Sequence, residues 1–117
     1  MEQPILSVEQ SGDVALIRVH EKKLYQKVVT PFQDEMIAVV DRGHKKLVVN
    51  LCEVDVMNSS GLGVLILLWD RLNKEGGKLV ITGLRPIMLE LFTRMRLDTL
   101  FPVAGSEEEA LGLFEEL

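Results

Sequence analysis

The chain has 117 residues, of which 18 are acidic and 13 are lysine or arginine, and its formal net charge is −5. This length suits one domain with one core, and the acidic balance disfavours direct nucleic-acid binding. The single cysteine excludes an internal disulfide, and no apolar run reaches the roughly 18 residues of a membrane span. The polar start lacks the pattern of a signal peptide, so we expect one cytoplasmic domain over residues 1–117.

The first predicted elements are two short strands joined by a turn. Residues 6–9 alternate between apolar and polar side chains, as a half-buried strand does. Residues 14–19 form a second apolar run, and the intervening Ser11-Gly12-Asp13 is typical of a turn. We therefore expect an opening β-hairpin. The charged and mixed segment His20–Val29 has no clear periodicity and predicts no element.

A helix is predicted to start at Thr30 and Pro31. Thr30 can act as the N-cap, Pro31 suits the first helical position, and Gln33 completes a capping box. Gly43 is expected to end this helix. The β-branched and apolar run over residues 47–52 then predicts a strand that is buried on both faces.

Helices and strands alternate from here to the end of the chain. The first three predicted elements are a helix from Asn58-Ser59-Ser60 to about Glu75, a strand over 78–82 and a helix over 86–96. A short strand over 100–103 follows, at an edge of the sheet if Pro102 lies within it, and the capping box Ser106–Glu109 opens a last helix. Such alternation predicts parallel strands joined by helical crossovers, and the opening hairpin makes the sheet mixed. The expected fold class is α/β, with a mixed sheet of about five strands and about four helices in a single domain.

The predicted elements do not bring histidine, cysteine or carboxylate side chains together as a catalytic or metal-binding site would. His20 and His44 lie in charged stretches and are expected to be solvated, and Cys52 is expected to be a small core residue. A dinucleotide-binding loop would need a third glycine where Ile66 follows Gly61-Leu62-Gly63. We therefore expect no enzyme, no cofactor and no bound metal.

Ser59 and Ser60 lie where a predicted strand passes into a predicted helix. The first N–H groups of a helix lack intrahelical partners and the helix dipole is positive there, so a negative charge is well tolerated. Asn58, Ser59 and Ser60 are also all favoured N-cap residues. Two interpretations follow: the serines are helix caps, or one of them is a phosphorylation site.

The helix that follows these serines is rich in apolar side chains. Its predicted apolar face consists of Leu62, Leu65, Ile66, Trp69 and Leu72. In one interpretation the helix is packed between the sheet and another helix. In the other, part of it is an exposed apolar surface beside Ser59 that binds a partner.

The motif Met57-Asn58-Ser59-Ser60-Gly61-Leu62-Gly63-Val64 resembles the core of the STAS domain. The family pattern at this place is close to Met-Asp-Ser-Ser-Gly-Leu-Gly, and the order of elements resembles that of bacterial anti-sigma-factor antagonists. Residues 74–80 resemble the family's helix end and the strand after it, and residues 91–97 resemble its third helix. The resemblance implies a STAS-like single domain over residues 1–117.

This resemblance implies a regulatory binding protein. In the family, the first serine of the pair is phosphorylated by a partner that is both an anti-sigma factor and a serine kinase of histidine-kinase-like ATPase fold. The unphosphorylated domain binds that partner and frees the sigma factor, and a PP2C-type phosphatase restores the binding form. Carried over to this chain, the resemblance implies phosphorylation at Ser59 and partner binding by Asn58, Ser59, Ser60, Gly61, Leu62 and Gly63.

Two departures from the family pattern motivate an alternative function. Asn58 stands in place of the usual aspartate, and His20–Lys27 replaces a short turn before the first helix. The alternative is a STAS scaffold without phosphorylation, for example a subunit of a membrane lipid-transport complex. A small nucleotide hydrolase is a third hypothesis, which the missing phosphate-binding loop disfavours.

Overall fold

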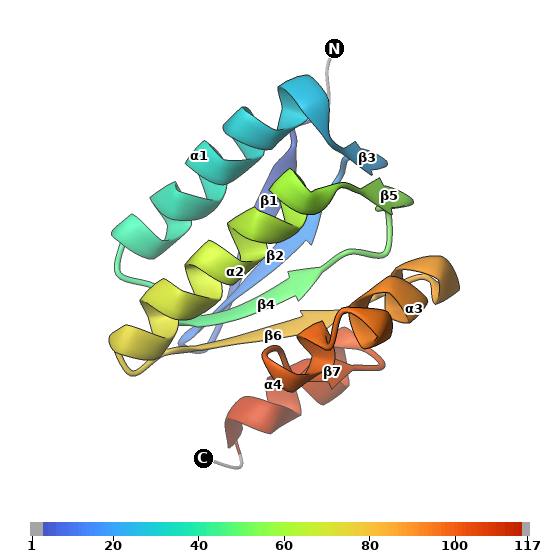
Figure 1. The fold of residues 1–117 in the computed structure, drawn as a ribbon. Coiled ribbons are helices and arrows are strands. Elements are labelled where there is room, and N and C mark those ends of the chain that lie inside the picture. Colours follow the sequence, from blue (N-terminus) through green and yellow to red (C-terminus); the bar gives the residue numbers. More distant parts are fainter. Residues whose placement is uncertain (1–3, 116–117) are drawn as a thin grey trace.

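A mixed sheet of five strands forms the centre of the molecule (Figure 1). The computed structural model describes residues 4–115. The strands of this sheet are β1 (Leu6–Ser11), β2 (Val14–Val19), β4 (Lys46–Asn50), β6 (Lys78–Thr82) and β7 (Val103–Ala104). They lie in the order β1-β2-β4-β6-β7, with β1 antiparallel to β2 and the other neighbours parallel. The predicted hairpin and the mixed sheet are confirmed.

Four α-helices accompany the sheet within residues 4–115. They are α1 (Val29–Asp41), α2 (Ser59–Lys74), α3 (Pro86–Arg94) and α4 (Glu107–Glu115), and short 3-10 turns span Gln26–Val28 and Leu97–Thr99. α1 and α2 lie side by side on one face of the sheet, and α4 covers the opposite face (Figure 1). None of the helices described combines the length and the apolar character that crossing a bilayer requires.

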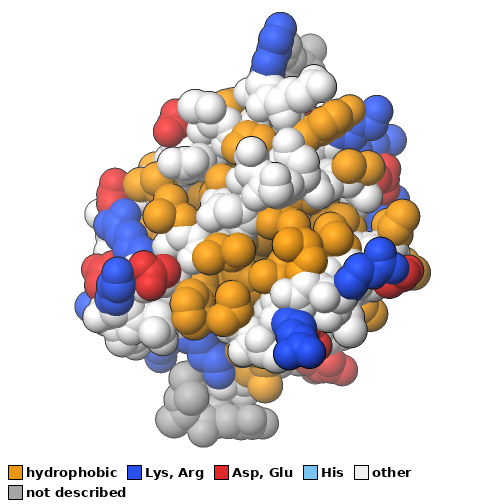
Figure 2. Space-filling view, viewed as in Figure 1, with side chains coloured by type: hydrophobic (Ala, Val, Ile, Leu, Met, Phe, Trp, Pro, Cys, Tyr) orange, Lys and Arg blue, Asp and Glu red, His pale blue; other side chains and the backbone are white. Residues whose placement is uncertain are grey.

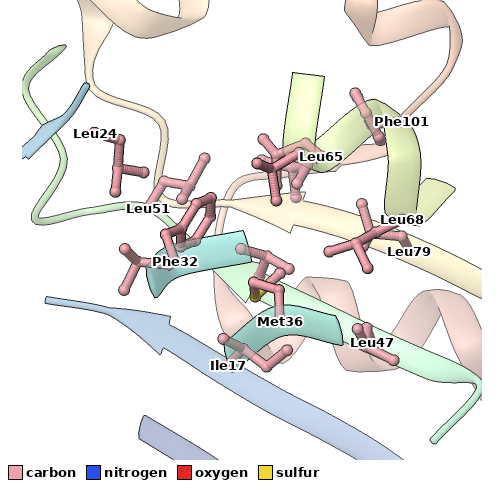
Figure 3. Close-up of a cluster of buried hydrophobic side chains, with 14 of the residues drawn as sticks. Ile17, Leu24, Phe32, Met36, Leu47, Leu51, Leu65, Leu68, Leu79 and Phe101 are labelled. Carbon is pink, nitrogen blue, oxygen red and sulfur yellow. The ribbon is translucent and has the colours of Figure 1, made fainter. Parts of the chain in front are cut away.

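The two faces of the sheet bury two separate groups of side chains, because alternate residues of a strand point to opposite faces. Figure 3 shows members of the larger group pointing toward one another between the sheet and the helices, among them Ile17, Phe32, Met36, Leu47, Leu65, Leu68 and Leu79. Val48 and Val80 face the other way and pack with Phe114 of α4. Burial on both faces of β4 confirms the predicted central strand. Each fully buried side chain of this kind contributes about 1.5–3 kcal/mol to folding.

A polar cluster at the carboxyl ends of β2 and β4 holds the start of α4 against the sheet. The Arg18 guanidinium donates to both carboxylate oxygens of Glu107 at 2.9 Å, and Asn50 Nδ2 donates to Glu107 Oε2 at 2.6 Å. The hydrogen bond from Arg18 lowers the pKa of the Glu107 carboxyl below its usual value, against the opposing effect of partial burial. A bidentate ion pair thus attaches this helix to the back of the sheet.

α1 begins at Val29 and lacks the predicted cap. The N-cap residue is Val28, which makes no side-chain cap bond, so the prediction of a capping box from Thr30 to Gln33 is wrong. The 3-10 turn before α1 leads directly into the helix, which places Thr30 and Pro31 inside its first turn. Proline is tolerated there because the N–H groups of that turn have no intrahelical partner.

The last strand of the sheet starts later than predicted. The Leu100 and Phe101 N–H groups donate to the Leu97 carbonyl, so both residues belong to a helical turn. β7 therefore contains only Val103–Ala104, and it lies at the edge of the sheet although Pro102 is not part of it. Pro102 lies just outside the strand, where its missing N–H removes no ladder bond.

The predicted N-cap of the last helix is present. Ser106 Oγ accepts a hydrogen bond from the Glu109 N–H at 3.1 Å. The Glu109 carboxylate accepts from the Gly105 N–H at 2.9 Å, one residue earlier than a capping box requires. The side chains of this first turn therefore satisfy backbone donors on both sides of Ser106.

We expect Glu107→Gln to lower the free energy of unfolding at pH 7 by about 1 kcal/mol, a modest value because solvent screens this partly exposed pair. The ionised carboxylate stabilises the fold above the usual carboxyl pKa, and this stabilisation is lost as pH falls through the lowered pKa of Glu107. Urea unfolding should therefore show that the difference from wild type shrinks below about pH 4.

Glu108→Gln is the matched control for this prediction. Glu108 is exposed in the same helical turn and forms no ion pair or side-chain hydrogen bond within residues 4–115. Its replacement removes the same charge from the same helix N-terminus. Equal losses in the two variants would mean that the helix dipole, and not the Arg18 contact, stabilises α4.

Candidate functional site

α2 begins at Ser59, after a loop that follows the carboxyl end of β4. Asn58 is the N-cap residue, and its Oδ1 accepts a hydrogen bond from the Gly61 N–H at 2.9 Å. The Asn58 carbonyl accepts from the Leu62 N–H at 3.0 Å. Asn58 therefore accepts hydrogen bonds from two N–H groups in the first turn of the helix. Its side-chain amide oxygen caps the helix as an aspartate carboxylate would.

This arrangement leaves the Ser59 and Ser60 side chains exposed. Within residues 4–115 neither hydroxyl makes a hydrogen bond, and the capping role belongs to Asn58. The two residues supply the first two N–H groups of α2, for which a helix has no internal acceptor. Ser59 thus combines an accessible hydroxyl with the positive end of a helix dipole.

The six residues predicted to bind a partner are brought together, but they play different parts. The exposed ones are Asn58, Ser59, Ser60 and Gly63. Gly61 and Leu62 are buried beneath them, and partner binding by the six residues stays a prediction. Their burial follows from the helix packing on its neighbours, and they position the exposed residues above them.

A second, two-stranded sheet fixes the start of α2. β3 (Lys23–Leu24) pairs in parallel with β5 (Val56–Met57), and the Asn58 N–H donates to the Leu24 carbonyl at 3.3 Å. A Cβ on Gly61 would lie only 2.8 Å from that carbonyl oxygen. The close approach therefore requires glycine at this position. The sequence did not predict this sheet, since strands of two residues show no periodicity.

The loop that leads to β5 is held by the residue before α3. Arg85 Nε donates to the Cys52 carbonyl at 2.7 Å, and the same guanidinium forms an ion pair with Asp55. The Cys52 side chain is exposed, so its prediction as a core residue is wrong. β4 ends at Asn50, and the chain has already left the sheet at Cys52.

His20 ties the same loop to the opening hairpin. Its Nε2 lies 2.8 Å from Ser7 Oγ, and its Nδ1 lies 2.7 Å from Glu53 Oε2. The His20 side chain is only 15% exposed, so the prediction of a solvated histidine is wrong. His44 is half-buried. The partners of His20 are 13 and 33 residues away in the chain, a separation that local sequence patterns do not reveal.

The exposed side of α2 continues from Ser59 as an apolar strip. Gly63 leaves this surface flat, and Ile66 and Leu67 are 36% and 46% exposed. The predicted apolar face is therefore partly wrong, because Ile66 faces solvent while Leu68 is buried between the sheet and α1. Figure 2 shows hydrophobic side chains gathered across the middle of this face of the molecule.

A groove of about 360 Å³ lies between β5 and α3, next to the chain that enters Ser59. Its apolar lining includes Val56 of β5 and Ile87 and Leu91 of α3. Val56 is 47% exposed and Ile87 is 69% exposed. Exposed side chains of this size indicate a surface that can bury apolar area against another protein.

In the part of the chain that the structure describes, no group of three or more His, Cys, Asp or Glu side chains could hold a metal ion. A phosphate on Ser59 would add about −1.5 to −2 charges at the helix start, where the dipole and the free N–H groups favour an anion. The start of α2 is therefore a place where an added negative charge would be tolerated.

Comparison with known proteins identifies the family. The family model of the STAS domain matches residues 6–110. BtrV of Bordetella bronchiseptica, an anti-sigma factor antagonist by name, is 36% identical over 81 residues, which cover 69% of this chain and 70% of BtrV. The crystal structure of an anti-sigma factor antagonist from Mycobacterium paratuberculosis is similar at a TM-score of 0.80 and 26% identity, covering 92% of this chain and 91% of that one. SpoIIAA of Bacillus in its phosphorylated form is similar at a TM-score of 0.71 and 21% identity, covering 93% and 98%.

The fold and the exposed helix start define a small α/β protein-interaction domain. The chain belongs to the STAS domain family. This confirms the predicted family and fold. The names of its relatives support the predicted function of an anti-sigma factor antagonist.

Alanine substitutions at Gly61 and Gly63 should change stability in opposite directions. A methyl group at Gly61 would press on the Leu24 carbonyl, and we expect Gly61→Ala to cost about 1–3 kcal/mol. At Gly63 nothing lies within 4 Å, and alanine in a helix should stabilise the fold by up to about 1 kcal/mol. Urea unfolding of both variants measures whether each substitution raises or lowers the free energy of unfolding. A neutral Gly61→Ala substitution would contradict the packing of α2 against β3.

Proposed function

We propose that this protein is an anti-sigma factor antagonist that binds an anti-sigma factor kinase and is released by phosphorylation at Ser59. The observation that carries the proposal is the division of roles at the start of α2, where Asn58 caps the helix and Ser59 remains exposed. A kinase can reach this hydroxyl without opening the helix end. Membership of the STAS family and the existence of SpoIIAA in a phosphorylated form support the proposal.

The partner-binding surface in this proposal starts at Ser59 and continues along the apolar strip of α2. Gly63 lets another chain approach the helix closely, and Ile66 and Leu67 offer apolar area beyond it. Binding would cover the serine hydroxyl together with this strip. The unphosphorylated form is then the binding form.

Phosphorylation in this proposal acts on the interface and leaves the fold intact. The helix dipole and the N–H groups of Ser59 and Ser60 stabilise the added charge within the domain. An interface closed over the Ser59 hydroxyl would have to bury a solvated dianion, which costs far more than burying a hydroxyl. Affinity for the partner therefore falls while the domain stays folded.

The chemistry of the switch belongs to the partners in this proposal. A kinase of histidine-kinase-like ATPase fold adds the phosphate, and a PP2C-type phosphatase removes it. The protein itself catalyses neither step, contacts no nucleic acid and acts in the cytoplasm. It changes transcription by occupying the anti-sigma factor, which then releases its sigma factor.

Baits that carry Ser59→Ala or Ser59→Glu test this proposal in pulldowns from native lysate with mass-spectrometric identification. We expect the alanine bait to retain a kinase of this fold and the glutamate bait to lose it, because a carboxylate at Ser59 mimics part of the phosphate charge. The recombinant pair should show an affinity at least about 10-fold lower for Ser59→Glu.

Ser60→Ala and Ser60→Glu are the matched controls, since Ser60 is exposed one residue further along the same turn. A switch that follows Ser60 instead of Ser59 would reassign the modified residue. Equal capture by the alanine and glutamate baits at Ser59 would reject the switch. Capture of membrane-transport subunits alone would favour the alternative scaffold function.

A further inference from the structure

Three lysines line one hollow in the segment before α1. Lys22, Lys23 and Lys27 are all exposed, and the hollow that they share measures about 490 Å³. We call residues 21–27 the basic segment. It carries three lysines against one acidic residue, Glu21, in a chain whose net charge is −5. The segment is therefore a positive region on an acidic protein.

Two polar side chains lie between these lysines. Tyr25 is half-buried and Gln26 is exposed, and both line the same hollow. Gln26 adopts a left-handed backbone with φ of 53°, which residues other than glycine seldom adopt. Gln26 follows β3 closely and is the first residue of the 3-10 turn Gln26–Val28. Strained backbone of this kind is concentrated at binding and catalytic sites.

The basic segment runs alongside the chain that enters Ser59. The Asp55 and Val56 N–H groups donate to the Lys22 carbonyl at 2.7 and 3.1 Å, and Lys23 pairs with Val56 across the small sheet. Figure 1 shows β3 and β5 together at the end of the molecule where α2 begins. Lys and Arg side chains are visible at the same place in Figure 2, at the upper right. The positive region and Ser59 therefore belong to one continuous surface.

The lysines of this segment form no ion pair within residues 4–115, unlike several other cations of the surface. The paired cations elsewhere include Arg18, Lys46, Arg71, Arg85 and Arg94. Glu53 and Asp55, the acids in the adjoining loop, are already engaged by His20 and Arg85. No carboxylate of the described residues thus lies within ion-pair distance of these three lysines, and their charge has the same sign as the positive end of the α2 dipole.

We propose that the basic segment is a second part of the partner-binding surface and binds an acidic face of the anti-sigma factor kinase. The inference rests on the proposed function, because the kinase is the protein that docks over Ser59. A free positive patch on an otherwise acidic chain orients an acidic partner and raises its association rate. The Tyr25 and Gln26 side chains supply hydrogen-bonding groups between the charges.

The same charges give phosphorylation a second effect on binding. A phosphate at Ser59 adds about −1.5 to −2 charges beside the three lysines. It cancels much of the positive potential that attracts the partner and repels the partner's acidic groups. One modification thus blocks the contact at Ser59 and also removes the long-range attraction.

Charge reversal in the double variant Lys23→Glu/Lys27→Glu tests the inference. The matched control is Arg42→Glu/Lys45→Glu, which changes net charge equally at two exposed residues near the opposite end of β4. Arg42 and Lys45 also form no ion pair within residues 4–115, so neither variant breaks an internal contact. Thermal unfolding checks that both variants are folded, and Lys23→Gln/Lys27→Gln provides a milder second variant.

The readout is the association rate with the recombinant kinase that the Ser59→Ala bait captures, measured by stopped flow at low and high salt. We expect the Lys23→Glu/Lys27→Glu variant to associate about 10-fold more slowly at about 20 mM salt and to approach wild type at about 300 mM. The neutral variant should lie between the two, and the Arg42→Glu/Lys45→Glu control should change less than about 2-fold.

Three outcomes would overturn the inference. They are an unchanged rate in the charge-reversed variant, an equal loss in the control, and a loss that does not depend on salt. If Ser59→Glu still abolishes binding in those cases, the proposed function stands and only the basic segment is excluded. If the alanine bait captures no kinase, the proposed function and this inference fail together.

Discussion

The placement of Ser59 depends on a close approach between two stretches of backbone. The Leu24 carbonyl accepts a hydrogen bond from the Asn58 N–H. The same carbonyl oxygen lies close to Gly61, where a side chain would prevent this approach. The first turn of α2 is therefore fixed to β3 and cannot tilt without losing this contact. Asn58 can then cap the helix, and the hydroxyl of Ser59 is directed to the surface because the cap position is already filled.

The polar contacts around the site are located beyond the carboxyl ends of the parallel strands. His20 and Arg85 hold the loop after β4, and on the other face of the sheet Arg18 holds α4 through Glu107. This edge is where open α/β sheets place their binding sites, because loops and helix N-termini meet there. The hydrophobic core under α1 and α2 stabilises the fold. The charged and strained residues at the carboxyl ends of the strands lie outside this core.

A negative charge at Ser59 would affect the fold of the domain and its affinity for a partner differently. In the proposed switch, the N-terminus of α2 would stabilise an anion at Ser59, and the modified domain would keep its fold. In the two proposals, the exposed strip beyond Gly63 and the basic segment belong to the surface that the partner covers, and the same anion would weaken binding there. A binding domain can act as a switch in this way, because only its affinity for the partner has to change.

Local patterns in the sequence were enough to predict the alternation of elements and the motif at the start of α2. Its hydrophobic periodicity predicted the hairpin, the central strands and the helices, because these signals are local and repeat along the chain. It also placed Asn58 and Ser59 between a strand and a helix. It did not distinguish the cap from the free serine, since both residue types can cap.

The contacts between distant segments could be seen only in the folded chain. The β3–β5 pair, the burial of His20 and the exposure of Cys52 depend on partners that are far apart in the chain. The buried side of α2 likewise depends on which neighbours pack against it, which is why Ile66 faces solvent and Leu68 does not. The basic segment gave no periodic signal, and its place beside Ser59 follows from two hydrogen-bonded strands of two residues each.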